Sequence, residues 1–188
     1  EDIQFNQTAS VNSSQFNWDF GDGSFSTLLD PTHQYVAPGD YQVKLVVTTA
    51  IGGCKDSVTQ TITAYPLPVP VYTLANQCVN AQVVYNNQST ILAPDNIATY
   101  AWSFGDGNTS ATQSPSHLYS NDGVYTTKLI LTSNHGCIDS ISHQVTVWPL
   151  PVVDFSPTEV CLNFDTQFSD LTNISSANCD KSKPTTSC

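Results

Sequence analysis

Hydrophobic and polar residues alternate most clearly over residues 41–48, which read Tyr-Gln-Val-Lys-Leu-Val-Val-Thr. Successive side chains of an extended chain point to opposite faces, so the run has one mainly hydrophobic face. One buried and one solvated face is typical of an antiparallel strand. Residues 15–20 and 55–64 predict further strands, and β-branched residues are frequent throughout. Because no window has the 3.6-residue period of a helix, the pattern predicts an all-β protein.

The chain repeats itself at a fixed interval. Residues 18–23 read Trp-Asp-Phe-Gly-Asp-Gly, and residues 102–107 read Trp-Ser-Phe-Gly-Asp-Gly. The motif Pro-x-His-x-Tyr at residues 31–35 returns at residues 115–119. Such self-similarity over a domain-sized interval indicates a tandem array of one folding unit. The residues that the repeat marks as structural are Trp18, Asp22, His33, Tyr41, Trp102, Asp106, His117 and Tyr125.

The motif Trp-x-Phe-Gly-Asp-Gly predicts a strand followed by a tight turn. Trp and Phe lie two residues apart and share the inward face, Gly accepts positive φ, and the Asp carboxylate can bond amides of its own turn. A turn aspartate can also bind calcium, and Asp19 with Asp22 supplies two carboxylates. Calcium takes six or more oxygens, however, and the second copy has Ser103 in place of Asp19. We prefer the structural interpretation and keep calcium as the alternative.

The charge of the chain excludes some functions. The 188 residues carry a net charge of −11, and the five basic residues are all lysines. Nucleic-acid binding needs a basic surface, usually with arginine, and an anionic membrane surface also attracts basic residues. No hydrophobic run approaches the roughly 20 residues that span a bilayer. We therefore expect neither a nucleic-acid partner nor membrane insertion.

Proline-rich segments divide the chain. Tyr-Pro-Leu-Pro at residues 65–68 and Trp-Pro-Leu-Pro at residues 148–151 occupy matching places, and consecutive X-Pro units are extended and stiff. We expect a first unit over residues 1–66 without its front strand and a complete unit over residues 67–149. Residues 150–188 should then hold the opening part of a third unit and an unassigned tail. Short strands, frequent turns and a buried Trp are typical of immunoglobulin-like sandwiches.

The combined motifs Trp-x-Phe-Gly-Asp-Gly, Pro-x-His-x-Tyr and Gly-x-Tyr-x-Val-x-Leu resemble the PKD domain, a sandwich family named after the polycystic kidney disease protein. The resemblance covers residues 1–151 well and residues 152–176 partially, and it implies tandem immunoglobulin-like (PKD-type) β-sandwiches. Gly-Cys-x-Asp-Ser at residues 53–57 and 136–140 is similar to PKD arrays in surface proteins of gliding Gram-negative bacteria. That similarity implies a protein exported by the type IX route and acting as an adhesin, stalk or filament.

The same resemblance implies glycosylation. Asp-Ser followed by an aliphatic residue is similar to the O-glycan acceptor of such bacteria, which would place sugars on Ser57 and Ser140. The alternative is an ordinary serine in an edge strand. Both interpretations stay open.

Six cysteines in a chain rich in Ser, Thr and Asn, and without Met, indicate disulfides in an extracellular setting. Their spacing does not suit zinc, and we expect no cofactor. The cysteines are Cys54, Cys78, Cys137, Cys161, Cys179 and Cys188. Cys78 and Cys137 could pair within the complete unit, yet a sandwich should place them at opposite poles, roughly 25 Å apart, and a disulfide needs Cα atoms within about 7 Å. The alternative joins the first-turn Cys of one unit to the last-hairpin Cys of the next, and the choice stays open.

Catalysis is not expected. His33 and His117 occupy equivalent places, whereas a catalytic residue need occur only once, so we interpret both as structural imidazoles bonded to a nearby loop. No nucleophile stands next to a base, and a sandwich of this size offers little concavity for a pair of catalytic carboxylates. We expect no catalytic residue and no enzymatic activity.

The expected function is that of a non-catalytic extracellular module, a segment of a cell-surface adhesin, stalk or filament. Neighbouring copies of the repeat are the expected partners, and surface glycans or proteins are further candidates. If the ends of the sequence are genuine, residues 152–170 could donate a strand to the next subunit and give a head-to-tail homopolymer. The competing interpretation is an accessory carbohydrate- or protein-binding module of a secreted hydrolase. Exposed and coplanar Trp148 and Tyr72 would favour that interpretation.

Overall fold

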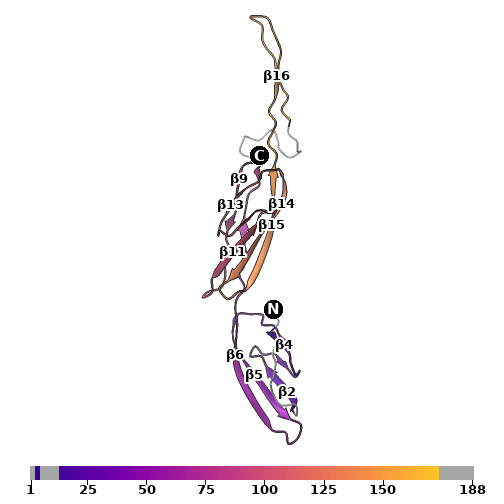
Figure 1. Cartoon of the computed structure of the whole chain (residues 1–188), viewed down its shortest axis with the longest axis vertical. Coiled ribbons are helices and arrows are strands. Elements are labelled where there is room, and N and C mark those ends of the chain that lie inside the picture. The colour runs from indigo at the N-terminus through magenta and orange to yellow at the C-terminus, as the bar shows by residue number, and fades with distance from the viewer. Residues whose placement is uncertain (1–2, 5–12, 174–188) are drawn as a thin grey trace. The chain divides into compact units, whose positions relative to one another are not determined.

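The computed structural model describes residues 3–4 and 13–173 of the 188-residue chain. Every regular element of this described part is a β-strand, which confirms the all-β class (Figure 1). The chain divides into two compact units, residues 1–66 and residues 67–188, and each is described by itself. Within the described residues, no helix could cross a membrane.

The described part of the first unit has six strands: β1 (Ile3–Gln4), β2 (Ser13–Asp19), β3 (Phe25–Ser26), β4 (Thr32–His33), β5 (Gly39–Thr49) and β6 (Lys55–Ala64). Four of them form an antiparallel sheet in the order β3–β2–β5–β6, and β1 pairs with β4. Trp18 of β2 lies opposite Leu45 of β5. These two side chains are buried together with Phe20 and Val43, so the hydrophobic residues of the alternating run lie beside Trp18 on the buried face of the sheet.

Residues 67–149 of the second unit contain nine strands: β7 (Tyr72–Thr73), β8 (Gln77–Cys78), β9 (Gln82–Val84), β10 (Asn86–Asn87), β11 (Ile97–Ser103), β12 (Thr109–Ser110), β13 (Ser116–Leu118), β14 (Gly123–Ser133) and β15 (Ile138–Trp148). Its main sheet has the order β12–β11–β14–β15–β8, and the pairs β7–β10 and β9–β13 supply further strands. Trp102 of the main sheet is buried with Tyr72 of β7, Val83 of β9 and Tyr85, which lies between β9 and β10. The core therefore lies between two layers, as in a β-sandwich.

The first and last strands of the second unit run in the same direction. The hydroxyl of Tyr72, in β7, accepts a hydrogen bond from the amide of His143, midway along β15. Further on, β8 pairs in parallel with the end of β15 and brings Cys78 beside Trp148. The chain therefore enters this unit at one pole, the N-terminal pole, and leaves at the other, the C-terminal pole (Figure 1).

Two details differ from the sequence-based expectation. Cys78 was expected in a turn, but it pairs with β15 and belongs to strand β8. The turn follows at Asn80, which has a positive φ of 64°. Trp148 was expected in the linker, yet it is the last residue of β15 because the same pairing prolongs that strand.

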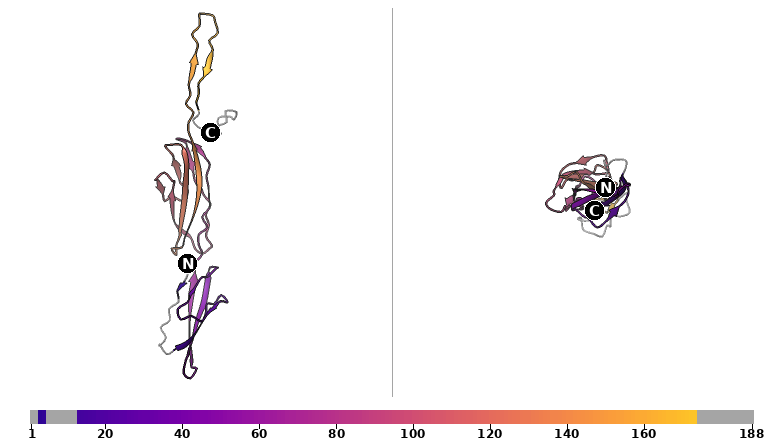
Figure 2. Two further views of the ribbon diagram at one scale, coloured as in Figure 1. Left: turned by 90° about the vertical axis from the view of Figure 1, so that its right-hand side faces the viewer. Right: turned by 90° about the horizontal axis from the view of Figure 1, so that it is seen from below.

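A separate hairpin follows Pro151. It consists of β16 (Phe155–Pro157) and β17 (Phe168–Asp170), which are antiparallel, and an isolated bridge joins Val152 to Asn173 at its base (Figure 2). All side chains in its two strands are exposed.

Candidate functional site

The repeated Gly-Asp-Gly turn packs its first glycine against a neighbouring strand. Gly105 has a φ of 85°, and a Cβ placed on it would lie 2.6 Å from the carbonyl oxygen of Thr126 in β14. Gly21 has the same conformation, with the Gln42 carbonyl oxygen 2.8 Å from such an atom. Only glycine fits both the positive φ and this close approach. The turn is thereby held against the sheet, and its aspartate is fixed in place.

In the first unit, the Asp22 carboxylate is occupied by bonds within its own unit. It accepts hydrogen bonds from the amide and hydroxyl of Ser24, and its other oxygen lies 2.8 Å from Nε2 of His33. The bonds from Ser24 in particular, and then the bond from His33, outweigh partial burial and lower the pKa of the Asp22 carboxyl to about 2. Asp19 accepts the amide of Gly21 at 3.0 Å. Both calcium candidates thus have protein donors.

The second unit repeats the arrangement. Nε2 of His117 lies 2.7 Å from the Asp106 carboxylate, which also accepts the amide and the side-chain NH₂ of Asn108. Partial burial raises the pKa of Asp106, but the bonds from His117 and Asn108 outweigh it and hold that pKa below its ordinary value. Among the described residues, no three His, Cys, Asp or Glu side chains are grouped so as to bind a metal ion.

Each histidine also lies among aromatic rings. The His117 ring stacks on Phe104 at a centroid distance of 4.2 Å and meets the edge of Tyr119 at 4.6 Å. The first unit repeats both contacts around His33, at 4.2 and 4.7 Å. We call the two copies the His–Asp clusters. Their members are Phe20, Asp22, His33, Tyr35 and Tyr41 in the first unit and Phe104, Asp106, His117, Tyr119 and Tyr125 in the second.

The tyrosines of the clusters bond to the backbone. The hydroxyl of Tyr119 donates to the Phe104 carbonyl at 2.8 Å, and its ring stacks on Tyr125 at 4.3 Å. The hydroxyl of Tyr125 donates to the carbonyl of Asn121, four residues upstream. Tyr41 makes the same bond to Ala37. A tyrosine bonded to the backbone a few residues earlier is the tyrosine corner of immunoglobulin-like sandwiches.

Two buried hydroxyl pairs escaped the sequence analysis. Tyr72 donates to Thr127 of β14, and the Thr127 hydroxyl in turn donates to the His143 carbonyl. Tyr85 donates to the hydroxyl of Tyr119 at 2.7 Å. Burial raises the pKa of Tyr72 and of Tyr85. Burial also raises the pKa of Tyr119, to about 12, although the hydrogen bond from Tyr85 acts to lower it. These phenols stay protonated at neutral pH and act as structural donors.

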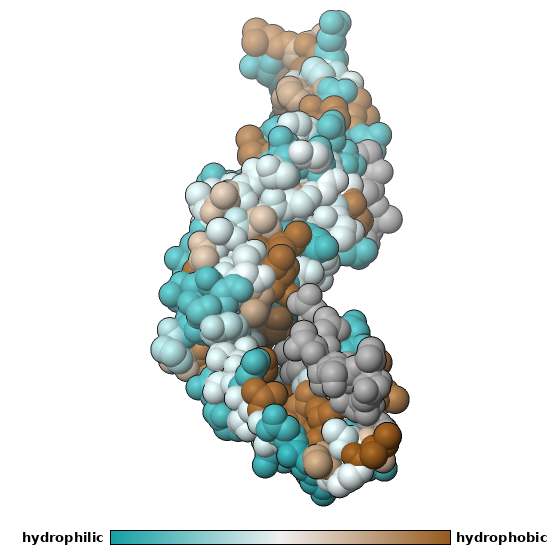
Figure 3. Space-filling view, turned by 60° about the horizontal axis from the view of Figure 1, so that its bottom comes forward, coloured by the Kyte–Doolittle hydropathy of each residue, from teal (hydrophilic) through white to brown (hydrophobic). Residues whose placement is uncertain are grey.

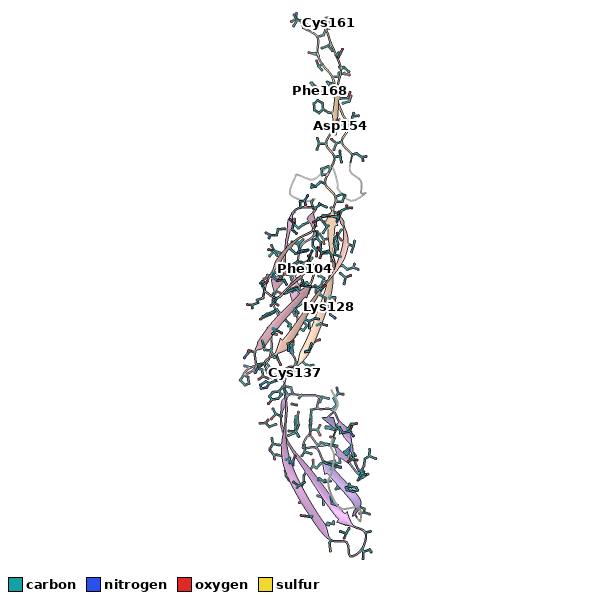
Figure 4. The ribbon with its side chains drawn as sticks, viewed as in Figure 1. Phe104, Lys128, Cys137, Asp154, Cys161 and Phe168 are labelled. Atoms are coloured by element: carbon teal, nitrogen blue, oxygen red, sulfur yellow. The ribbon has the colours of Figure 1, made fainter. Side chains whose placement is uncertain are left out.

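The cysteines of the second unit lie at opposite poles. Cys78 is beside Trp148 at the end of β15, and Cys137 directly precedes its first residue (Figure 4). Since β15 has 11 residues, at about 3.3 Å each, the two cysteines are roughly 35 Å apart, and a bond between them within the unit is ruled out. Cys54, Cys78, Cys137 and Cys161 are free thiols in the structure. Cys179 and Cys188 lie outside the described residues.

The glycan candidates occupy equivalent strand positions. Ser57 lies opposite Val46 and Ser140 opposite Ile130, and both serines are exposed. β6 is the edge of its sheet, and β15 has a second neighbour only at its far end. Each serine amide bonds to the carboxylate of the aspartate before it, which holds the Asp-Ser pair in a fixed conformation.

Tyr72 and Trp148 do not form an exposed aromatic platform for a sugar. Tyr72 is only 3% exposed, because its ring packs edge-on against Trp102 and its hydroxyl bonds to β14. Trp148 is half-buried at the end of β15. The condition set for a sugar-binding surface, an exposed and coplanar pair of Trp148 and Tyr72, is therefore not met.

Comparison with known proteins gives one family and several relatives. The model of the PKD domain matches residues 1–64 and again residues 66–148. Collagenase ColA of Bacillus cereus is 32% identical over 69 residues, which are 37% of this chain and 7% of that protein. Microbial collagenase of Vibrio alginolyticus is 27% identical over 81 residues, which are 43% of this chain and 10% of that protein. The chain thus spans a small part of the curated relatives it matches.

Solved structures include similar single domains. The PKD1 domain of Vibrio anguillarum Epp is 27% identical, with a TM-score of 0.42, and the match covers 45% of this chain and 96% of that domain. The PKD1 domain of the Vibrio cholerae metalloprotease PrtV is 30% identical, with a TM-score of 0.40 and coverage of 43% and 96%.

Proposed function

Since this chain belongs to the PKD domain family, we propose that it is a non-catalytic extracellular module whose sandwiches act in series as a spacer. The parent protein would be a cell-surface adhesin, stalk or filament of the kind that gliding Gram-negative bacteria export by the type IX route. The Gly-Cys-x-Asp-Ser segments of both units support that setting. Its partners would be neighbouring copies of the same repeat.

The path of the chain through the second unit carries this proposal. The chain enters at the N-terminal pole and leaves beside Cys78 at the C-terminal pole. A unit with its ends at opposite poles extends a chain by its own length, whereas one with adjacent ends would not. At about 3.3 Å per residue, the 11-residue strand β15 gives a length of about 35 Å for the unit.

The His–Asp clusters support a non-catalytic role. The imidazoles of His33 and His117 are paired with carboxylates in their own turns, and both copies use the same contacts. The buried phenols bond to each other or to the backbone. Groups engaged in this way stabilise the sandwich and are not poised to attack a substrate.

The spacer role can be tested by lengthening the chain. A variant with a second copy of residues 67–149 inserted after residue 149 should show a maximum dimension, measured by small-angle X-ray scattering, that is larger by about 35 Å. An increase near zero would show that the units fold back on one another and would contradict a spacer. The unmodified chain is the control.

A second candidate is an accessory module of a secreted hydrolase, and the matches to collagenases favour it. The test is co-sedimentation of the full chain with insoluble collagen and with insoluble polysaccharides. A spacer should stay in the supernatant. Retention on collagen that is lost when the exposed Phe25 or Leu28 is changed to Ser would favour the accessory role instead.

We also propose O-glycans on Ser57 and Ser140. Their exposure and their position on the outer strand leave room for a sugar. Intact-mass measurement of protein from a gliding bacterium, compared with the variants Ser57→Ala and Ser140→Ala, tests the proposal. Equal masses, after allowance for one oxygen, would contradict it.

A further inference from the structure

The hairpin at residues 152–173 repeats the opening hairpin of the second unit, residues 69–90. The bridge between Val152 and Asn173 corresponds to the bridge between Val69 and Thr90. The two segments have equal length, and each directly follows a Pro-rich segment, residues 65–68 or residues 148–151.

The pairing inside the two hairpins is also the same. Phe155 lies opposite Asp170 where Tyr72 lies opposite Asn87. The turn residues Asn163 and Asn80 have φ values of 71° and 64°, and they are the two residues other than glycine with positive φ in the described part of the chain. The hairpin therefore has the backbone of a PKD opening hairpin, although it lies beyond the residues that the family model matches.

The exposure of the aromatic face separates the two copies. Tyr72 and Tyr85 are 3% and 0% exposed, whereas Phe155 and Phe168 in the same places are 60% and 68% exposed. The two phenylalanine rings lie 5.9 Å apart, close to the 6.1 Å between the two tyrosines. Figure 4 shows Phe168 projecting from the hairpin, and hydrophobic surface is visible on the hairpin at the top of Figure 3.

The second unit shows what covers this face. The ring of Tyr72 meets Trp102 at 4.9 Å, and the ring of Tyr85 meets Trp102 at 5.4 Å and Phe104 at 5.2 Å. The cover is thus a Trp-x-Phe strand with its neighbour β14. A face with the same backbone and the same ring spacing fits a sheet of the same kind.

The missing hydroxyls define that sheet further. Tyr72 bonds to Thr127, and a Phe in its place leaves that threonine without this partner. In the first unit Val43 follows the Gly-x-Tyr motif where Thr127 follows it in the second. Because Phe155 offers a hydrocarbon edge, it matches a valine there better than a threonine.

We propose that the Phe155–Phe168 face is a docking surface for the core sheet of a further PKD unit, one whose strand beside the Trp-x-Phe strand reads Gly-x-Tyr-x-Val. This inference goes beyond the spacer role and does not depend on what the array binds.

A graft within the full chain tests the fit. Residues 69–90 are replaced by the sequence of residues 152–173, and hydrogen exchange of β11 and β14 is followed by mass spectrometry. Protection of both strands should persist. The matched control is the same graft with Phe155→Ser and Phe168→Ser, which should lose it. In the graft, Thr166 takes the place of the buried Val83. A second graft that also carries Thr166→Val puts valine back at this position, so that the buried hydroxyl of one threonine cannot decide the result.

The direction of the Tm change caused by one substitution tests which type of sheet the hairpin fits. In the native chain Thr127→Val should lower the Tm of the second unit by about 4–8 °C, because Tyr72 loses a buried partner. In the graft the same substitution should raise the Tm. Loss of protection in both grafts, or a Tm shift of the same sign in both backgrounds, would overturn the proposal. The proposal would also be overturned by a particular kind of dimer of the native chain. If Phe155→Ser and Phe168→Ser abolish the dimer and Trp18→Ala leaves it intact, the hairpins pack on each other.

Discussion

At the scale of single residues, the two glycines of the Gly-Asp-Gly turn have different roles. Gly105 and Gly107 both have positive φ, of 85° and 95°. Only Gly105 lies against the neighbouring strand, since a Cβ on Gly107 would meet nothing within 4 Å. The first glycine is required by packing as well as by conformation, and the second by conformation alone.

This difference gives a prediction. Gly107→Ala should lower the free energy of unfolding of the second unit by about 1–2 kcal/mol, the cost of a left-handed alanine. Gly105→Ala should lower it by about 3–5 kcal/mol, because the methyl group also overlaps Thr126. Urea unfolding followed by circular dichroism measures both. Equal losses in the two variants would contradict the close approach.

The low pKa of Asp22 predicts acid sensitivity in the first unit. The folded pKa of about 2 lies below the ordinary 3.8, so the unfolded chain binds the proton more tightly. The stabilisation is therefore complete above about pH 4 and is lost as the pH falls toward 2. Asp22→Asn should weaken the unit at neutral pH and flatten its pH dependence between pH 4 and 2. Fluorescence-monitored unfolding measures this, with the exposed Asp165→Asn as a charge-matched control.

Residues differ in how far their surroundings could be predicted from the sequence. The inward face of Trp18 and Trp102 follows from the two-residue spacing to Phe, which is a local signal. The pairs Tyr72–Thr127 and Tyr85–Tyr119 join positions far apart in the chain, and nothing near either residue indicates its partner. One signal was present: the second copy carries a threonine where the first carries Val43, and a polar residue at a core position implies a buried partner.

At the scale of elements, β8 and β15 decide the cysteine chemistry. Sequence alone predicted opposite poles for Cys78 and Cys137 but left the pairing open, because the length of the first strand could not be read from two short hydrophobic runs. The parallel pairing of Cys78 with Trp148 fixes that length. Parallel contacts between strands so far apart in sequence leave no local pattern, and β8 itself was expected to be a turn.

Peptide mapping of the oxidised chain under non-reducing conditions should therefore show no bond between Cys78 and Cys137 within one molecule. Cys78→Ser and Cys137→Ser should leave the Tm of the second unit equally unaffected in oxidising and reducing buffer. A Tm that rises on oxidation of the wild type and not of either variant would contradict the placement of β8.

At the scale of the whole molecule, matched positions in the two units are buried to different degrees. Leu131 and Val145 of the second unit are fully buried. The equivalent Val47 and Ile62 of the first unit are only half-buried. Folding therefore removes less apolar surface from water at these two positions in the first unit than in the second. The hydrophobic stabilisation of the first unit is correspondingly smaller.

The first unit should therefore unfold at lower urea concentration. Hydrogen exchange measured by mass spectrometry should show β2 and β5 losing protection before β11 and β14. Val47→Ala should move the first transition alone. A single transition shared by all four strands would contradict independent units.

The parallel contact between β8 and β15 also determines how the second unit responds to mechanical force. When its two ends are drawn apart, Cys78 and Trp148 slide past each other along their strands, and the bonds there, including the 2.8 Å bond from the Val79 amide to the Trp148 carbonyl, are loaded together instead of opening one after another. A sandwich closed in this way should yield late and abruptly under tension.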